Sequence, residues 1–374
     1  MWVYFITFSI SLLLYYIISK SKIRPFKIQL LFNKSIILTK SNIACCSASI
    51  PLFLISGLRY AVGTDYFATY YTGFYRVLED SSVDNFDLGF HGLIKGIQLF
   101  TDNAIWLFFI GSLIFIGLTM ITIQDISVSP LYSVLLLLIT RFYFIGMNVV
   151  KQAIALAIIV CSIKYIINQD KKKFVLTVLT ASFFHYSSLV FLPVYFLGRI
   201  KLTFSKICIY ILVDIGVFVI GIRYVLRLIS HTKYGFLLNK FEVCGIKFMI
   251  FQVIINLLLF LVAYSNKQQK KDMVSRVFIN LQFLALLIAL TLRTIPLMER
   301  IYWIFTFPQI ITIPYFMKLQ KKTSRWILNS IVIGALFIFM IYDIGYVGDH
   351  DALPYQWIFG KSLIYDTGWI KLYH

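Results

Sequence analysis

The stretch that decides the fold of this chain is Ala104-Ile-Trp-Leu-Phe-Phe-Ile-Gly-Ser-Leu-Ile-Phe-Ile-Gly-Leu-Thr-Met-Ile-Thr-Ile123. It contains no charged residue and has the length of roughly 20 apolar residues with which an α-helix crosses a bilayer. Similar runs recur along the whole chain. Hydrophobic residues make up 60% of the sequence and charged residues only 14%, whereas a soluble domain carries about 25% charged residues. We therefore predict an all-α, polytopic integral membrane protein whose residues 1–374 form a single membrane domain.

The apolar runs predict where the membrane spans lie. They are placed at 2–18, 42–59, 104–123, 131–146, 149–167, 207–222, 247–264, 277–293, 301–317 and 326–345. A further apolar segment, 174–198, is either one more span or a broken, re-entrant hairpin. The prediction is therefore about 10–12 transmembrane helices.

The formal net charge of +19 first suggests a nucleic-acid partner. We exclude that partner because the basic residues fall between the hydrophobic runs, where they fix topology, and not on one face of a soluble module. They gather in the loops 20–40, 164–173, 199–206, 267–276 and 318–325. The positive-inside rule places these loops in the cytoplasm.

Two consecutive basic loops constrain the segment between them. Because 164–173 and 199–206 are both expected in the cytoplasm, the chain at 174–198 should return to the side that it left. We therefore predict a hairpin that turns near His185-Tyr-Ser-Ser188. The loop 60–103 and the tail 346–374 then face the extracytoplasmic side, together with most of the isolated polar residues.

One outward-facing segment carries the most informative polar residues, Arg59-Tyr-Ala-Val-Gly-Thr-Asp65-Tyr66-Phe-Ala-Thr-Tyr70-Tyr71. Ionisable groups at membrane depth are energetically expensive, so they are functional candidates. Within the same external loop, 66–78 is predicted to form a short interfacial helix. A second, weakly amphipathic segment is expected at 89–100.

The candidate site residues divide by the chemistry of their side chains. The candidate catalytic bases are Asp65, Asp87 and His185. The candidate ligands of an anionic group are Arg59, Arg141, Lys151, Arg293 and Arg300. Tyr66 and Tyr70 are candidates for stacking on sugar rings. No metal-ligand spacing is present among the cysteines of the sequence, so we predict neither a metal site nor a cofactor.

Structural explanations compete with several of these assignments. Arg59 and Asp65 could form a simple interfacial salt bridge, and Lys151 could extend to the membrane surface without any other role. The tyrosines could belong to an aromatic belt. A lone histidine such as His185 is as often structural as catalytic.

The order of these motifs resembles the EpsG family of polytopic bacterial membrane proteins. The resemblance covers Leu58 to Tyr302 and rests on the Arg…Gly-Thr-Asp-Tyr…Tyr signature, supported by segments around His185 and Arg300. Where the family usually has Arg-Gln, this chain has Lys151-Gln152. Lysine keeps the charge but lacks the planar fork that holds a phosphate at two points.

The resemblance implies a surface-polysaccharide polymerase of the Wzy type, which is a metal-independent glycosyltransferase. Such a protein transfers a growing glycan from undecaprenyl pyrophosphate to a lipid-linked repeat unit. The active site would face the periplasm, or extracytoplasmic side, of the bacterial inner membrane. Its expected partners are the undecaprenyl-pyrophosphate-linked oligosaccharide, the lipid bilayer and, as a further candidate, a chain-length regulator.

Three other functions compete with this interpretation. A membrane O-acyltransferase that modifies surface glycans has a similar length and number of spans. A lipid-linked oligosaccharide flippase should have two related halves and a polar path that reaches both faces, and the sequence has neither feature. An O-antigen ligase uses the same donor, and only the family resemblance separates it from a polymerase.

Overall fold

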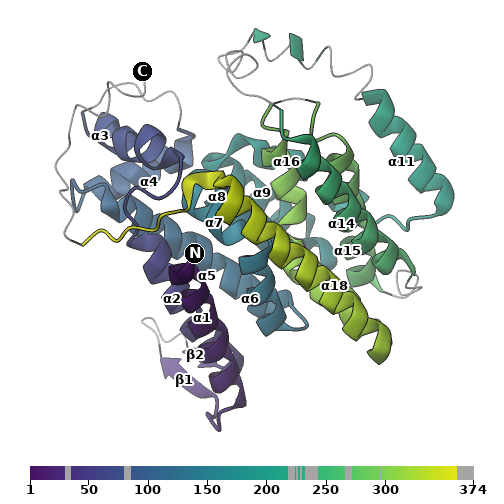
Figure 1. Cartoon of the computed structure of the whole chain (residues 1–374), viewed down its shortest axis with the longest axis horizontal. Helices are drawn as coiled ribbons and strands as arrows, with labels where there is room; N and C mark the ends of the chain where they lie inside the picture. Colours follow the sequence, from purple (N-terminus) through teal and green to yellow (C-terminus); the bar gives the residue numbers. More distant parts are fainter. Residues whose placement is uncertain are drawn as a thin grey trace. The chain divides into compact units, whose positions relative to one another are not determined.

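The computed structural model of this chain describes residues 1–29, 35–79, 86–217, 224, 226–227, 230–231, 243–265, 272–294 and 296–359. These residues are almost entirely helical (Figure 1), which confirms the predicted all-α class. Six helices are long and apolar enough to cross a membrane among the described residues. They are α1 (Trp2–Lys20), α5 (Ile105–Ile126), α8 (Val150–Ile167), α14 (Ile246–Ser265), α15 (Met273–Leu290) and α18 (Lys322–Met340) with its π-helical continuation Ile341–Val347. The chain is therefore a multi-pass membrane protein.

Shorter helices occupy the other predicted spans. The helix α2 (Lys40–Gly57) begins at a capping box, in which Thr39 and Asn42 each bond the other's backbone N–H. The predicted span 301–317 is divided into α16 (Met298–Thr306) and α17 (Gln309–Lys318). Pro308 precedes α17 as its N-cap residue and cannot donate a helical hydrogen bond. The helix α11 (Phe204–Gly216) covers the start of the span predicted at 207–222, and 218–222 lie outside the described residues.

The segment 174–198 reverses direction, as the charge pattern predicts. The helix α9 (Lys171–Phe184) is followed by a 3-10 turn (Tyr186–Phe191) and by α10 (Val194–Leu197). The ring of Tyr195 lies 5.4 Å from that of Phe174. The guanidinium of Arg199 donates to Gln169 Oε1 at 2.7 Å, which brings the two ends of the segment together. The chain therefore leaves and returns within this segment, with its turn at His185.

The region predicted as one continuous span, 131–146, is instead a bent pair of helices. The helices α6 (Pro130–Ile139) and α7 (Phe142–Asn148) meet at an angle of 57°. Arg141 between them has a left-handed backbone, with φ of 70°, which ends the regular hydrogen bonding of α6. The apolar segment predicted as a span is therefore helical but broken at Arg141, because nothing in an apolar run reports a single left-handed residue.

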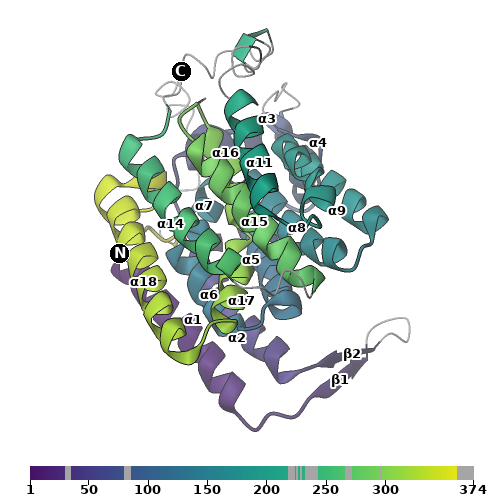
Figure 2. The same cartoon turned by 90° about the vertical axis from the view of Figure 1, so that its right-hand side faces the viewer.

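The chain divides into two compact units. Unit 1 comprises residues 1–161, 180–186 and 322–374, and unit 2 comprises residues 162–179 and 187–321. In unit 1, α2 packs between α1 and α5, and α6 contacts α1, α5 and α18. A two-stranded antiparallel ladder, β1 (Phe26–Gln29) with β2 (Ser35–Leu38), connects α1 to α2 (Figure 2). The sequence analysis did not anticipate this ladder.

Unit 2 is built on α14 and α15, which lie side by side in both views (Figures 1 and 2). Neutral polar side chains bond to one another in its core. Asn256 Oδ1 accepts hydrogen bonds from Gln282 and Gln309, at 3.0 and 2.7 Å. Its Nδ2 donates to the phenol of Tyr302. Such bonds between apolar helices satisfy polar groups that would otherwise be buried without partners.

The loop 60–103 contains the two helices expected from its sequence. A π-helix (Tyr66–Tyr71) continues directly into α3 (Thr72–Leu78), and α4 (Leu88–Gln98) follows. Residues 80–85 between them lie outside the described part of the chain. Both helices pack on α5, through Phe108 and the buried faces of Phe74 and Phe90. The loop is therefore a folded layer of unit 1.

Candidate functional site

The Gly63-Thr64-Asp65 turn is held against the last residue of α7. Asn148 Oδ1 accepts hydrogen bonds from the Thr64 hydroxyl at 3.0 Å and from the Asp65 N–H at 2.9 Å. Gly63 has φ of 110°, and a Cβ at this position would lie 3.3 Å from Asn148. Only glycine combines that backbone conformation with so close an approach. The turn leaves the Asp65 side chain half-buried and Thr64 exposed.

Arg59, which precedes this turn in the chain, is buried and held by hydrogen bonds. Its side chain is 1% exposed, and its guanidinium lies over the ring of Phe108. The guanidinium donates to the carbonyls of Ser56, Val62 and Met147 and to the hydroxyl of Ser112. These partners favour a structural role for Arg59, as the anchor that joins α2, α5 and α7. A direct contact between Arg59 and a substrate stays a prediction.

The tyrosines predicted to stack on sugars are also buried. Tyr66 and Tyr70 are each 1% exposed. The ring of Tyr66 stacks on that of Phe108 with centroids 4.0 Å apart. The hydroxyl of Tyr70 accepts a hydrogen bond from the Lys151 N–H at 3.4 Å. This packing favours a core role for both rings.

Asp87, Lys151 and His185 converge on one buried cluster, although they come from three separate elements. Lys151 Nζ lies 3.1 Å from Asp87 Oδ2, and His185 Nδ1 lies 3.7 Å from the same oxygen. The three side chains are 5%, 17% and 14% exposed for Asp87, Lys151 and His185. Asp87 precedes α4, Lys151 lies in the first turn of α8, and His185 follows α9. All three are residues that the sequence analysis had selected.

A glycine permits this convergence. A Cβ at Gly89 would lie 2.8 Å from Phe183 Cβ and 2.9 Å from the Phe183 carbonyl oxygen. The first turn of α4 and the last turn of α9 are therefore in backbone contact. Because Asp87 and His185 flank this contact, Gly89 sets the distance between their side chains.

The environment of Asp87 keeps its side chain ionised. Burial by itself would raise the pKa of Asp87, but the His185 imidazole and the charge and hydrogen bond of Lys151 outweigh it. The pKa of Asp87 therefore lies below its usual value. A carboxylate with a lowered pKa is a weak base, whereas histidine is the side chain used most often as a general base. Within the cluster, Asp87 is suited to orient or stabilise a partner, and His185 is suited to take a proton.

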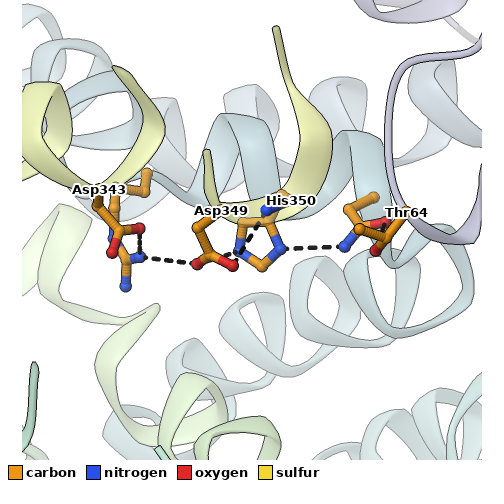
Figure 3. A network of polar contacts seen from close by, with 6 residues as sticks. Thr64, Asp343, Asp349 and His350 are labelled. Atoms are coloured by element: carbon orange, nitrogen blue, oxygen red, sulfur yellow. Dashed lines mark hydrogen bonds and ion pairs between the residues drawn. The ribbon is translucent and has the colours of Figure 1, made fainter. Parts of the chain in front are cut away.

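Arg141 lies in a second network, which reaches the C-terminal end of unit 1 (Figure 3). It is paired with the carboxylate of Asp343, and its Nη1 lies 3.3 Å from Asp349 Oδ2. His350 Nε2 lies 3.4 Å from the same Asp349 oxygen. His350 Nδ1 lies 3.0 Å from Asn148 Nδ2. Two carboxylates thus compensate the charge of Arg141, which favours an anchoring role over binding of an external anion.

The remaining predicted cations belong to unit 2. Arg293 is exposed and donates to the Cys244 carbonyl at 2.7 Å. Arg300 is half-buried in the first turn of α16, next to Glu299. Both stay candidate phosphate ligands.

The sequence analysis gave no role to several residues that organise these clusters. Asn148 was not among the candidate residues, and Asp343, Asp349 and His350 fall in the predicted last span or in the tail 346–374. A signal was available in Gly348-Asp-His-Asp351, a group of ionisable residues that immediately follows the last apolar helix. Ionisable residues at a membrane boundary are functional candidates for the same reason as Asp65.

Comparisons with known proteins agree with the motif order. A family model described as the EpsG family matches residues 42–357. The matched region contains the Asp87 cluster and the network of Arg141, Asp343, Asp349 and His350. No curated protein and no solved structure matches the chain.

Proposed function

Because this chain belongs to the EpsG family of exopolysaccharide polymerase-like membrane proteins, we propose that it is a surface-polysaccharide polymerase of the Wzy type. It transfers a growing glycan from one undecaprenyl-pyrophosphate carrier to the sugar hydroxyl of a second carrier that bears one repeat unit. The reaction takes place at the extracytoplasmic face of the bacterial inner membrane.

The observation that carries this proposal is the cluster of Asp87, Lys151 and His185. Glycosyl transfer needs a base beside the acceptor hydroxyl. A buried carboxylate next to an imidazole, with an ammonium that keeps the carboxylate charged, meets that need. The cluster lies beside the folded external loop, where the resemblance to the family is most specific.

In the proposed reaction, His185 accepts the proton of the acceptor hydroxyl. The hydroxyl oxygen forms a bond to the anomeric carbon of the donor, and the bond from that carbon to the carrier pyrophosphate breaks. The pyrophosphate leaves with the electron pair, and His185 later releases its proton to water. Asp87 orients the imidazole and stabilises its protonated form, as carboxylates do for catalytic histidines.

Asp65 is the second candidate for the base. Its backbone is fixed by Asn148 and its carboxylate is half-buried beside the exposed Thr64. If Asp65 is the base, the Asp87 cluster has a supporting role only. The two assignments make different predictions for Asp65→Asn and His185→Ala.

Arg293 and Arg300 stay predicted ligands of an anionic group, and both belong to unit 2, whereas the Asp87 cluster belongs to unit 1. Charge-assisted donors stabilise a departing phosphate strongly. Arg59 and Arg141 are left out of this role, because their guanidinium groups already bind carbonyls and carboxylates inside unit 1.

The test is the glycan made by a deletion strain that is complemented with single variants. Loss of the protein should leave one repeat unit on the lipid anchor. Asp87→Asn and His185→Ala should give the same product at normal membrane levels, whereas the exposed His231→Ala should restore long chains. Full-length chains that lack acyl groups would instead indicate the acyltransferase. Absence of any transferred glycan would indicate a ligase or a flippase.

A further inference from the structure

The C-terminal segment that follows α18 is hydrogen-bonded to the loop that carries the Gly63-Thr64-Asp65 turn. Three backbone bonds join the two segments: Ile358 N–H to the Leu58 carbonyl at 3.0 Å, Tyr60 N–H to Gln356 at 2.9 Å and Gly63 N–H to Asp351 at 3.1 Å. Residues 351–358 are therefore paired with the segment 58–63, and Asn148 binds Thr64 and Asp65 of the turn.

The hydrogen bonds of Asn148 determine which way its amide faces. The Asp65 backbone N–H can only donate, so the Asn148 atom 2.9 Å from it must be the oxygen. The amide nitrogen, Nδ2, must then face His350 Nδ1 at 3.0 Å. An amide nitrogen can only donate, so His350 Nδ1 must accept.

This requirement selects one protonation state of His350. In a neutral imidazole one nitrogen accepts and the other carries the proton. Since Nδ1 accepts from Asn148, the proton resides on Nε2, which lies 3.4 Å from Asp349 Oδ2. Asp349 also accepts a hydrogen bond from the His350 backbone N–H at 3.0 Å. The polar network drawn in Figure 3 is thus consistent only with a neutral ring.

We propose that Asn148 and His350 are positioning residues for the Gly63-Thr64-Asp65 turn, and that they hold it only while His350 is neutral. A second proton on His350 would place an N–H at Nδ1, opposite the N–H groups of Asn148. The Asn148 amide would then have to rotate, and the Asp65 N–H would lose its acceptor.

Charged and titratable groups surround the ring from several elements. Asp349 lies on the same segment, Asp343 on the continuation of α18 and Arg141 at the break between α6 and α7. From α1, the Tyr4 phenol donates to the Ala352 carbonyl at 2.8 Å. Arg141 also pairs with Asp349, whose Oδ2 lies 3.4 Å from Nε2 of the ring.

Two substitutions at position 350 separate this proposal from a general packing role. His350→Ala removes the acceptor for Asn148. His350→Asn retains an acceptor oxygen near the position of Nδ1 and does not titrate. The exposed His231→Asn is the matched control.

The experiment is hydrogen exchange, measured by mass spectrometry on the full-length protein in lipid nanodiscs at about pH 8 and about pH 5.5, around the ordinary histidine pKa. After correction for the intrinsic rate, exchange in peptides that cover residues 58–66 should be faster by on the order of tenfold at the lower pH. His350→Ala should exchange rapidly at both pH values, and His350→Asn should restore protection at both. An acid effect that persists in His350→Asn, or unchanged exchange in His350→Ala, would overturn the proposal.

The activity arm rests on the proposed function, whereas the exchange arm does not. Chain growth should fall in His350→Ala and recover in His350→Asn, with the sensitivity to acid removed. If exchange responds as expected but His185→Ala still makes long chains, the assignment of the base fails and the positioning role stands. If His185→Ala stops chain growth but His350→Ala leaves hydrogen exchange unchanged, the positioning role is refuted and the proposed function stands.

Discussion

Lys151 Nζ lies 3.1 Å from Asp87 Oδ2, and this ion pair joins the start of α8 to the start of α4. Just before Lys151 in the chain, Asn148 binds the Gly63-Thr64-Asp65 turn. The junction of α7 and α8 therefore supports both polar clusters of unit 1. A displacement of this junction would disturb the Asp65 turn and the Asp87 cluster together.

We expect Lys151→Gln to abolish chain growth and to destabilise the protein. Removing the ammonium leaves the Asp87 carboxylate buried and uncompensated, a change that typically costs about 3–5 kcal/mol. Lys151→Arg preserves the charge, so chain growth should stay within a few fold. The two variants are compared by glycan length and by thermal unfolding in detergent. Equal loss in both would show that the shape of lysine, and not its charge, is what matters.

We expect Gly89→Ala to separate Asp87 from His185. The new Cβ would meet the Phe183 backbone at less than a normal contact distance. Chain growth should fall at least tenfold while the protein still inserts into the membrane. Gly92→Ala is the matched control on the same helix, because its Cβ would meet nothing within 4 Å. That control should be neutral or stabilise α4 by about 0.5–1 kcal/mol. Similar losses in both variants would mean that helix propensity, not close approach, accounts for the effect.

The helical fold and the three residues of the Asp87 cluster could both be predicted, because each depends on a local feature of the sequence. A span of apolar residues and an isolated charge at its edge are both local features, and hydrophobicity alone assigns them. The distance between Asp87 and His185 is not a local feature. It depends on how α4 and α9 pack, which no pattern within either helix determines.

The roles of Arg59 and Arg141 could not be predicted, because their partners are remote in sequence or carry no chemical signature. Arg59 bonds mostly to backbone carbonyls, which every residue possesses. Arg141 pairs with Asp343, which is 202 positions away. From the sequence alone, a cation at a membrane edge is therefore interpreted as an anion-binding residue. Only the structure shows which groups it binds.

The lowered pKa of Asp87 predicts how stability depends on pH. A carboxyl group whose pKa is lower in the folded protein adds stability above its ordinary pKa, about 3.9, and loses that contribution as the pH falls through the folded value. The difference in unfolding temperature between the wild type and Asp87→Asn should therefore shrink as the pH falls from about 5 to about 3. Thermal unfolding across this range gives the measurement, and a difference that grows within it would contradict the sign of the shift.

The buried pair of Arg141 and Asp343 predicts a specific pattern of stability in single and double variants. Both side chains are less than one-tenth exposed, so Arg141→Met alone should leave Asp343 charged and unpaired, at a cost of roughly 3–5 kcal/mol. Arg141→Met combined with Asp343→Leu removes both charges, and the remaining partner Asp349, 41% exposed, is solvated. The double variant should therefore be more stable than Arg141→Met.

Thermal unfolding of the purified protein in detergent measures this pattern. The surface pair of Lys173 and Asp170, 3.0 Å apart, is the matched control, and its double neutralisation should have no measurable effect. Destabilisation of the Arg141 double variant by the sum of its two single changes would contradict the prediction. It would mean that each side chain contributes through separate contacts, such as the stacking of Arg141 on Phe339.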